Sequence, residues 1–417
     1  MDKSARICVV GLGHVGLTLA VTFANAGFHV VGLDNDTNKV KAINDGISNS
    51  EDVTSSSLQN LEAKGYLSAA STFAKIKDCD VVIICVPTPL DDKKEPDLSY
   101  ITSAAEQIAT FAHNDMLIVL ESTVYPGTTR EIVVPIFSKK NLNIDRDIWI
   151  CFSPERIDPG RHDWTSFNTP KIIGGITPKC LELGKTLYSA AFKTVICVSS
   201  VEAAEMTKIL ENSFRAVNIA FINEMMKHCD LLGLDIWELI NAASTKPFGF
   251  MKFDPGPGVG GHCIPIDPLY LSWKIHQFNC DTEFISLAHK INSQMPSYWV
   301  SKAERKLKEL GKSLAKSRIL ILGMAYKRDV SDYRESPPLE IARLLLEQGA
   351  LVEYYDPFIP SVTVQETLLR SALDLDSSIK QANCIIIATA HTCFNTIDFQ
   401  ALSCPVINCR GPQITHK

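Results

Sequence analysis

A single cysteine lies in the middle of a loop dense in glycine and proline, GVGGHCIPIDP at residues 258–268. Glycine has no Cβ, so backbone in such a loop can approach a ligand closely. Cys263 could therefore attack an aldehyde to give a thiohemiacetal, and loss of hydride to NAD would then give a thioester. The alternative is an inert cysteine that acts as a small apolar residue. Spacing alone leaves both interpretations open, and the adjacent His262 is assigned no role as a base.

Three polar residues could support such a cysteine. Lys208 and Asn212 are four residues apart in a helical pattern, so they share one face of the predicted helix. A lysine directed into a site stabilises an alkoxide or a tetrahedral oxyanion. Asp267 follows Cys263 by four residues and could assist proton transfer. A solvated surface lysine is the alternative for Lys208, and spacing does not decide between the two.

Three glycines near the N-terminus predict a cofactor site. Gly11, Gly13 and Gly16 form G-x-G-x-x-G between a strand-like and a helix-like run. They would permit a tight turn, leave room for a pyrophosphate and allow close helix packing, while the helix N-terminus favours phosphate. Asp34, at the end of the next predicted strand, would bind ribose hydroxyls and repel a ribose phosphate, which favours NAD over NADP. A glycine turn used only for packing is the alternative.

Two further segments follow predicted strands, VPTP at 86–89 and ESTVYPGTT at 121–129. Loops after the carboxyl ends of parallel strands line the ligand crevice of an open α/β sheet. Thr88 and Thr123 are therefore candidate contacts for the nicotinamide side of the cofactor. Ordinary threonines at strand ends are the alternative.

The elements that would position these residues alternate between strand and helix. In the first part we expect strands at 6–10, 30–34, 80–87, 116–123 and 149–155 and helices at 15–26 and 100–112. In the last part we expect strands in SRILILGMAY, LVEYYDP and NCIIIATAH and a helix over 339–350. The turn GMAYKRD lacks the glycine pattern and should not bind a dinucleotide in the same way.

The middle of the chain reads as helical. Residues 201–233 have apolar residues at helical spacing with no proline or internal glycine, which predicts one long helix ended by Gly233. Residues 282–310 are also mainly helical, with an irregularity at Pro296, whereas 48–60 is the most loop-like stretch. The fold class is therefore α/β, with two doubly wound Rossmann-like domains joined by a helical middle domain. We place the boundaries at 1–199, 200–310 and 311–417.

Composition limits the function classes. The 417 residues carry a net charge of −6, which argues against nucleic acid as the main partner. The thirteen cysteines include no C-x-x-C pair, so we expect neither a disulfide framework nor a zinc site, and a reducing cytoplasm fits best. The N-terminus has no signal-peptide layout, and the apolar run at 81–87 is too short to span a bilayer. No metal and no membrane insertion are expected.

The motifs GLGHVG, VPTP, ESTVYPGTT, SPER, EMTKILENSFRAVNIAFINE, GVGGHCIPIDP and GMAYKRDVSDYRESP occur in this order along essentially the whole chain. In this it resembles the nucleotide-sugar 6-dehydrogenases, the UDP-glucose and UDP-N-acetylhexosamine dehydrogenases. The resemblance implies four-electron oxidation of a sugar primary alcohol to a carboxylate, with two NAD and no free aldehyde. It also implies a cytoplasmic enzyme of surface-polysaccharide synthesis that forms a homodimer or larger homo-oligomer through its helical middle domain.

The resemblance assigns roles residue by residue. It implies that Cys263 is the nucleophile, that Lys208 and Asn212 stabilise the oxyanion, and that Asp267 assists general base chemistry. Thr123 and Glu155 would order a water molecule and the proton path. The remaining implied contacts are Gly11, Gly13, Val15, Gly16, Asp34, Thr88, Thr123 and Arg334 for the cofactor, and Glu155, Arg156, Lys208, Asn212, Phe250, Gly258 and Lys327 for the UDP-sugar.

Two departures concern the substrate. UDP-glucose members usually have an Asn-Pro-Glu-Phe-Leu run where this chain has SPER, and an arginine before the cysteine loop that reaches the neighbouring subunit's sugar. Here that region is TKPFGFMKFDPGPG, without the arginine, and Phe248, Gly249 and Phe250 offer an apolar wall and a gap for an acetamido methyl group. We therefore expect UDP-N-acetylglucosamine as the substrate, with UDP-glucose and UDP-N-acetylmannosamine as rivals.

Two other functions compete with this one. A non-catalytic NAD-binding scaffold would not need the Cys263, Lys208 and Asn212 set. A hydroxyacid dehydrogenase with the same first domain would have no use for the cysteine and would yield one NADH per substrate.

Overall fold

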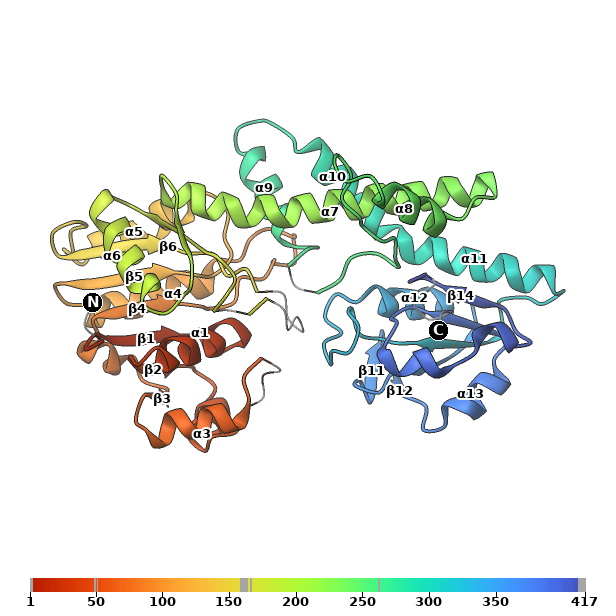
Figure 1. Ribbon diagram of the computed structural model, residues 1–417, viewed down its shortest axis with the longest axis horizontal. Coiled ribbons are helices and arrows are strands. Elements are labelled where there is room, and N and C mark those ends of the chain that lie inside the picture. The colour runs from red at the N-terminus through yellow and green to blue at the C-terminus, as the bar shows by residue number, and fades with distance from the viewer. Residues whose placement is uncertain are drawn as a thin grey trace. The chain divides into compact units, whose positions relative to one another are not determined.

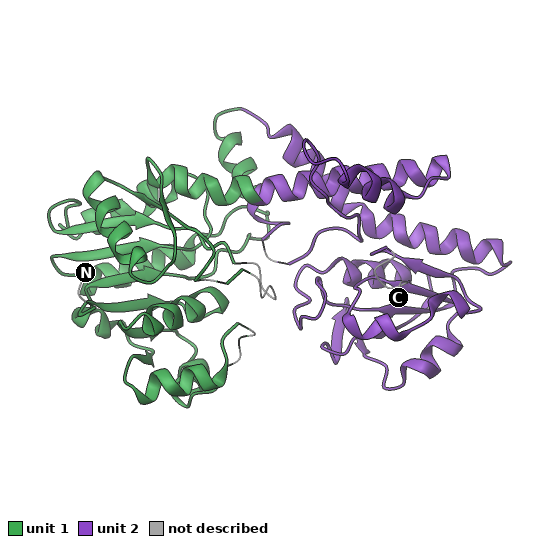
Figure 2. Cartoon of the chain, viewed as in Figure 1, with its two compact units in different colours: residues 1–211, 269–279 green, residues 212–268, 280–417 purple. Residues whose placement is uncertain are grey.

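The computed structural model describes residues 3–48, 50, 52–157, 164–165, 167–261 and 263–411. His262 thus lies outside the described residues. The chain forms two compact units, coloured separately in Figure 2. Unit 1 comprises residues 1–211 and 269–279, and unit 2 comprises residues 212–268 and 280–417. The three predicted domains, 1–199, 200–310 and 311–417, divide the chain differently, and that division stays a prediction.

Unit 1 is built on an eight-stranded sheet in which only β6 and β7 pair antiparallel. In sheet order, the strands are β3 (Leu67–Ala70), β2 (His29–Leu33), β1 (Arg6–Val10), β4 (Val81–Ile84), β5 (Met116–Leu120), β6 (Ile148–Phe152), β7 (Lys171–Gly175) and β8 (Val195–Cys197). The central strands β4 and β5 are buried throughout, as expected for apolar parallel strands covered on both faces. The order reverses between β1 and β4, which makes this the switch point where α/β proteins bind ligands.

Helices cover both faces of this sheet (Figure 1). They are α1 (His14–Asn25), α2 (Thr37–Asn44), α3 (Ser55–Ala63), η1 (Phe73–Asp78), α4 (Ser99–Phe111), η2 (Thr129–Val133), α5 (Val134–Ser138) and α6 (Pro178–Ser189). One apolar core joins α1, α3 and α6 to the sheet, and a second joins η1, α4 and α5 to its other face. The strand ends that carry the candidate residues are thereby held by packed layers.

Helix α7 (Val201–Leu232) is the long helix predicted from the sequence. Gly233 ends it in a left-handed conformation with φ of 68°, and the amide of Leu234 donates to the carbonyl of Cys229 at 2.9 Å. This is the hydrogen bond of a glycine-terminated helix end. The prediction that Gly233 ends the helix is confirmed.

Unit 2 contains a parallel four-stranded sheet and a separate hairpin. The sheet strands are, in order, β10 (Leu351–Tyr355), β9 (Arg318–Leu322), β13 (Cys384–Ile387) and β14 (Val406–Asn408), and the hairpin is β11 (Ser361–Val364) with β12 (Thr367–Arg370). The helices are α8 (Ile236–Ser244), α10 (Glu283–Ser293), α11 (Met295–Glu309), α12 (Pro337–Glu347), α13 (Leu375–Gln381), η3 (Thr392–Thr396) and η4 (Phe399–Ala401), while α9 (Asp267–His276) begins in unit 2 and continues in unit 1. One core joins α7, α8, α11 and α12 to the sheet.

Most predicted elements are confirmed to within a few residues at their ends, including the break before Pro296, which lies in the first turn of α11. The prediction of a loop over 48–60 is wrong from Ser55 onward, because α3 begins there. Thr54 caps this helix by accepting a hydrogen bond from the amide of Ser57 at 3.2 Å. A threonine cap before a weakly apolar serine-rich run is a helix start, and the serine content concealed it.

Candidate active site

The glycine turn between β1 and α1 has the geometry of a dinucleotide site. Gly11 has φ of 92°, and a Cβ there would lie 2.6 Å from the carbonyl oxygen of Cys85. A Cβ on Gly16 would lie 1.8 Å from the carbonyl oxygen of Gly11, whereas a Cβ on Gly13 would meet nothing within 4 Å. Gly13 has no side chain with which to cap α1, and Val15 follows in the first turn. The open approach at Gly13 and the uncapped helix start fit the pyrophosphate of NAD.

Asp34 directly follows β2 and is tied to this turn. Its Oδ2 accepts hydrogen bonds from the amide of Leu12 and from Nζ of Lys39, both at 2.8 Å, and its Oδ1 accepts from the amide of Asp36 at 3.0 Å. Burial opposes ionisation of the carboxyl group, but Lys39 and the two amides prevail and lower its pKa. Asp34 is therefore charged where an NAD ribose would lie. The contribution of Lys39 was not predicted from the sequence.

Thr88, Thr123 and Glu155 come together along one edge of the sheet. They follow β4, β5 and β6, which are neighbours in the sheet and parallel, so their carboxyl ends meet at the same edge as the glycine turn. The carbonyl of Thr88 accepts a hydrogen bond from the hydroxyl of buried Tyr270. Thr123 is half-buried. The sequence prediction that these loops line one crevice edge therefore has a structural basis in unit 1.

The SPER segment is held by charges on other elements. The guanidinium nitrogens Nε and Nη2 of Arg156 donate to the carboxylate of Glu211 on α7, at 3.2 and 2.6 Å. The third nitrogen, Nη1, donates to the carbonyl of Pro170 at 2.6 Å. Glu155 accepts hydrogen bonds from Nζ of Lys171 and from two backbone amides. Lys171 carried no sequence signal, because it opens a strand that the sequence did not predict.

Helix α7 presents Lys208 and Asn212 one turn apart, and both side chains are buried. The alternative of a solvated surface lysine at Lys208 therefore does not apply. One turn earlier, buried Glu205 accepts hydrogen bonds from the amides of Gly127 and Thr129 at 2.6 and 2.8 Å. Burial raises the pKa of Glu205 to about 7, against the effect of these hydrogen bonds. Glu205 fixes the loop after Thr123 to α7.

The cysteine loop lies in unit 2 and depends on its glycines. Gly258 and Gly261 have φ of 126° and 79°, and Gly261 donates its amide to the carbonyl of Arg334 at 3.1 Å. A Cβ on Gly260 or Gly261 would lie 2.8 or 2.9 Å from Tyr326. Side chains at these positions would displace the loop. The glycines therefore serve close packing against residues 326–337.

Cys263 is half-buried, and its carbonyl accepts hydrogen bonds from the amides of Ile266 and Asp267 at 3.1 and 2.8 Å. Asp267 is buried, and its Oδ2 accepts a hydrogen bond from Nδ2 of Asn212 at 2.6 Å. The structure thus brings together three of the predicted residues, Cys263, Asp267 and Asn212, within unit 2. Lys208, Thr123 and Glu155 belong to unit 1, and their approach to Cys263 stays a prediction.

The turn after β9 carries the predicted phosphate contacts Lys327 and Arg334. The guanidinium of Arg334 pairs with Asp332 at 2.7 Å. Its pKa is raised, first by the hydrogen bonds to Asp332 and also by neighbouring groups that include Cys263. Arg410, which the sequence did not single out, donates from Nε to the carbonyl of Ala388 at 3.0 Å. Lys327, Arg334 and Arg410 thus all follow the carboxyl ends of β9 and β14, and guanidinium groups are suited to binding a diphosphate.

The turn after β9 differs from the glycine turn after β1, because Ala325 stands where the first turn has Gly13. The carboxylate of Asp356 accepts from the amides of Met324 and Ala325, at 2.7 and 3.1 Å, and from Nε2 of buried His391 at 3.0 Å. Asp34 likewise accepts from the amide of Leu12 in the first turn, so the additional engaged amide in the turn after β9 is that of Ala325. That this turn does not bind a dinucleotide in the same way stays a prediction.

The two phenylalanines expected to form an apolar wall for the sugar differ in their exposure to solvent. Phe248 is 70% exposed, with Nζ of Lys246 4.9 Å from its ring centroid, and Phe250 is half-buried. Gly249 has φ of 71°. Phe248 can therefore serve as a wall only where a ligand or another chain covers it.

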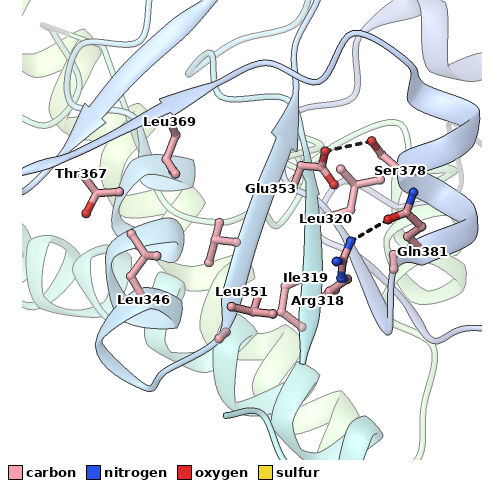
Figure 3. A pocket seen from close by; sticks show the side chains of 13 residues that line it. Arg318, Ile319, Leu320, Leu346, Leu351, Glu353, Thr367, Leu369, Ser378 and Gln381 are labelled. Atoms are coloured by element: carbon pink, nitrogen blue, oxygen red, sulfur yellow. Dashed lines mark hydrogen bonds between the residues drawn. The ribbon is translucent and has the colours of Figure 1, made fainter. Parts of the chain in front are cut away.

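A cavity of about 420 Å³ in unit 2 lies away from these residues, beside the amino-terminal parts of β9 and β10. Figure 3 shows two hydrogen-bonded pairs among its lining residues, Arg318 with Gln381 and Ser378 with Glu353, with donor–acceptor distances of 2.6 and 3.1 Å. It is not part of the candidate active site.

Comparisons with known proteins cover nearly the whole chain. Three domains of the UDP-glucose/GDP-mannose dehydrogenase family match in order: the NAD binding domain over residues 5–192, the central domain over 202–294 and the UDP binding domain over 320–410. Among the described residues, no helix is both long and apolar enough to cross a membrane.

Individual relatives agree with these domains. A UDP-N-acetyl-D-mannosamine dehydrogenase of Methanococcus maripaludis is 37% identical over 94% of this chain and 87% of that protein. A UDP-N-acetyl-D-glucosamine 6-dehydrogenase of Pseudomonas aeruginosa is 34% identical over 86% of this chain and 84% of that protein. The solved structure of a UDP-D-ManNAc dehydrogenase from Pyrococcus horikoshii superposes with a TM-score of 0.90 and 31% identity, covering 99% of this chain and 96% of that chain.

Proposed function

This chain belongs to the UDP-glucose/GDP-mannose dehydrogenase family, and on that premise we propose that it oxidises the carbon-6 alcohol of a UDP-N-acetylhexosamine to the carboxylate. The family membership makes it an NAD-dependent nucleotide-sugar dehydrogenase. The observation that carries the four-electron proposal is the cysteine loop, in which Cys263 lies beside the hydrogen-bonded pair of Asp267 and Asn212. A dehydrogenase that stopped at the aldehyde would not need a thiol there.

The first half of the reaction converts the alcohol to the aldehyde. NAD supplies the hydride acceptor in both oxidations. The carbon-6 hydroxyl gives its proton to the water molecule that we assign to Thr123 and Glu155, which passes it to solvent, while hydride leaves the carbon. The ammonium group of Lys208 stabilises the alkoxide that develops on the oxygen. Asp34 and the glycine turn orient the cofactor, and the edge that carries Thr88 and Thr123 lies at the switch point beside them.

The second half proceeds on the enzyme. The thiolate of Cys263 adds to the aldehyde carbon, and Lys208 with the second N–H of the Asn212 amide stabilises the oxyanion. Loss of hydride from the same carbon gives the thioester. Water then attacks, the C–S bond breaks, and the thiolate is restored, with Asp267 accepting the proton of the water. One alcohol, two NAD⁺ and one water thus give one carboxylate, two NADH and three protons.

The epimer of the sugar is the open part of the proposal. The apolar residues Phe248 and Phe250 and the missing arginine favour an acetamido sugar over glucose. The sequence prediction placed UDP-N-acetylglucosamine first, and one relative carries that name. Relatives named for UDP-N-acetyl-D-mannosamine cover more of the chain. We therefore propose the manno epimer as the first substrate to assay and the gluco epimer as the second.

We also propose a homodimer formed by the helical middle of the chain. Phe214 and Phe221 lie two turns apart on α7 and are 48% and 54% exposed, and Phe284 on α10 is 77% exposed. Large apolar groups spaced along one helix face are typical of a protein interface. UDP-glucose members of the family carry in this region an arginine that reaches the neighbouring subunit's sugar, and the exposed Phe248 supports a subunit contact near the same segment here. A cytoplasmic location and a role in surface-polysaccharide synthesis remain predictions.

The experiment is an NADH assay with purified protein and a panel of UDP-N-acetylmannosamine, UDP-N-acetylglucosamine and UDP-glucose under one set of conditions. We expect kcat/KM for an acetamido sugar to exceed that for UDP-glucose by about 10–200-fold, the range for gain of a small apolar contact. A preference for UDP-glucose would contradict the acetamido assignment and leave the four-electron mechanism standing.

A further inference from the structure

A group of buried charges lies behind the strand ends of unit 1. Nζ of Lys171 lies 2.7 Å from Oε2 of Glu121 and 3.0 Å from Oε2 of Glu155. The other carboxylate oxygen of Glu121 accepts a hydrogen bond from the hydroxyl of Tyr188. The side chains of Lys171 and Glu121 are 4% and 0% exposed, and that of Glu155 is 13% exposed. The cluster thus joins the fully buried Glu121 to a carboxylate at the edge of the crevice.

The ammonium group of Lys171 is the counter-ion of two carboxylates in this cluster, those of Glu121 and Glu155. Burying charge is costly unless each ion is paired and hydrogen-bonded. Burial opposes ionisation of Lys171, but the charges of Glu121 and Glu155 outweigh it and raise the pKa of the ammonium group. The rings of Tyr188 and Phe192 lie 5.8 and 5.6 Å from Nζ and enclose it. Lys171 therefore stays charged and fixed in place.

The hydrogen bonds of Glu155 all favour its ionised form. Its Oε1 accepts from the amides of Arg156 and Ile157 at 2.7 and 2.8 Å, and its Oε2 accepts from Lys171 at 3.0 Å. Burial opposes ionisation, but Lys171 and these amides lower the pKa of Glu155. For Glu121, burial prevails and raises the pKa. The pKa values of the two carboxylates that share Lys171 are thus shifted in opposite directions, and Glu155, which follows the end of β6, is the one that stays ionised.

We propose that Lys171, with Glu121 as its second counter-ion, is a positioning residue that keeps Glu155 a fixed, ionised acceptor which orients water, and that Glu155 does not itself carry a proton during turnover. The inference rests on the proposed function. A group that takes up protons in catalysis works best when it titrates near the working pH. A carboxylate with three donors can instead hold a water molecule by one remaining lone pair. Proton uptake is then left to another group, for which Asp267 is our assignment.

Other titratable groups of unit 1 face the cluster and must be held constant in a test. They are Cys85 after β4, Cys151 on β6, Tyr188 on α6, and the pair of Arg156 with Glu211. Burial raises the pKa of the Cys85 and Cys151 thiols, so both stay neutral at working pH. The charge that distinguishes Glu155 from an ordinary carboxylate is therefore that of Lys171.

The test compares the pH dependence of kcat in wild type, Lys171→Gln and Glu121→Gln. Removing the lysine should move the acid limb of the profile upward by about 1–3 pH units, the usual effect of an adjacent opposite charge. Removing the glutamate leaves Lys171 to Glu155 alone, so the limb should stay or move to lower pH. An upward shift in Lys171→Gln without one in Glu121→Gln cannot come from general loss of stability, because both variants break the same buried ion pair. Lys179→Gln, which breaks the exposed Lys179–Glu182 pair, is the matched control and should leave the profile unchanged.

Lys171→Arg guards against a variant that fails to fold, because it keeps the charge and should keep the limb in place. An upward limb in Lys171→Arg, or an unmoved limb in Lys171→Gln, would overturn the inference. A readout without catalysis separates it from the proposed function: the infrared carboxylate band that is lost in Glu155→Gln should persist to lower pH in wild type than in Lys171→Gln. If that band behaves as stated while no UDP-sugar is oxidised, the proposed function fails and the positioning role stands.

Discussion

Nδ2 of Asn212 donates a hydrogen bond to Oδ2 of Asp267 at 2.6 Å, joining α7 to the end of the cysteine loop. Both side chains are buried, so the bond fixes the orientation of the amide and of the carboxylate together. One N–H of the amide is used, which leaves its other N–H as the donor that we assign to the oxyanion. The side chains of Asn212 and Asp267 thereby hold each other in place near Cys263.

The role of Cys263 predicts the behaviour of Cys263→Ser. Serine is a poorer nucleophile, and an oxygen ester is a poorer acyl intermediate than a thioester. We expect NAD binding at the wild-type affinity, no sustained turnover, and either a trapped adduct or a stop after one oxidation. Isothermal titration and a progress curve of NADH formation would measure this. Steady release of two NADH per sugar at the wild-type rate would rule out the nucleophile.

The contacts of Asp34 predict cofactor choice. Asp34→Ala removes charged hydrogen bonds to the ribose and should weaken NAD binding by about 1.5–3 kcal/mol. It also releases Lys39 from its ion pair, so NADP binding should improve. The double variant Asp34→Ala/Lys39→Met should lose that improvement. Equal NADP affinity in the single and double variants would show that Lys39 does not reach the ribose phosphate.

Glu205 predicts a pH dependence of stability. Its pKa in the folded protein is about 7, against about 4.3 in an unfolded chain. The folded state therefore binds more protons between these values, and the contribution of Glu205 to the free energy of unfolding falls as pH rises through this window. Glu205→Gln removes the titration, so the free energy of unfolding of wild type minus that of the variant should fall from pH 5 to pH 7.5, by at most about 3 kcal/mol. Urea unfolding at several pH values would measure it, and a rise of this signed difference with pH would contradict the raised pKa.

The exposed apolar face of α7 predicts the oligomeric state. Phe221→Glu places a charge in the proposed interface and should shift the sedimentation of the protein from dimer toward monomer. Phe278→Glu changes an equally large exposed phenylalanine, 65% exposed, on the α9 side of unit 1 and is the control that should stay dimeric. A monomeric wild type would contradict the homodimer, and a Phe221→Glu dimer of unchanged stability would place the interface elsewhere.

Local signals accounted for what the sequence predicted correctly. The glycine turn was predictable because two of its three glycines answer a local steric demand, at Gly11 a positive φ and at Gly16 contact with backbone. The end of α7 at Gly233 and the break before Pro296 follow from backbone chemistry that acts within a few residues. Asp34 was predictable for the same reason, because an acidic residue at the end of the strand that follows a glycine turn is a local signal.

Contacts between residues far apart in the chain could not be predicted from the sequence. Lys171 meets Glu121 across 50 positions and Glu155 across 16, and neither spacing has a periodic signature. Lys39 and Arg410 look like ordinary surface cations until the fold brings them to Asp34 and to the carbonyl of Ala388. The hairpin β11–β12 was missed because β11 alternates over only four residues, and β12 has two adjacent leucines and no alternation.

The most direct test of the four-electron mechanism is the stoichiometry of NADH released per molecule of limiting UDP-N-acetylhexosamine, measured to completion with excess NAD and with the sugar product identified by mass. The account predicts two NADH per sugar, a uronic acid product and no aldehyde captured by a hydrazine trap. One NADH per sugar with a trapped aldehyde would contradict it.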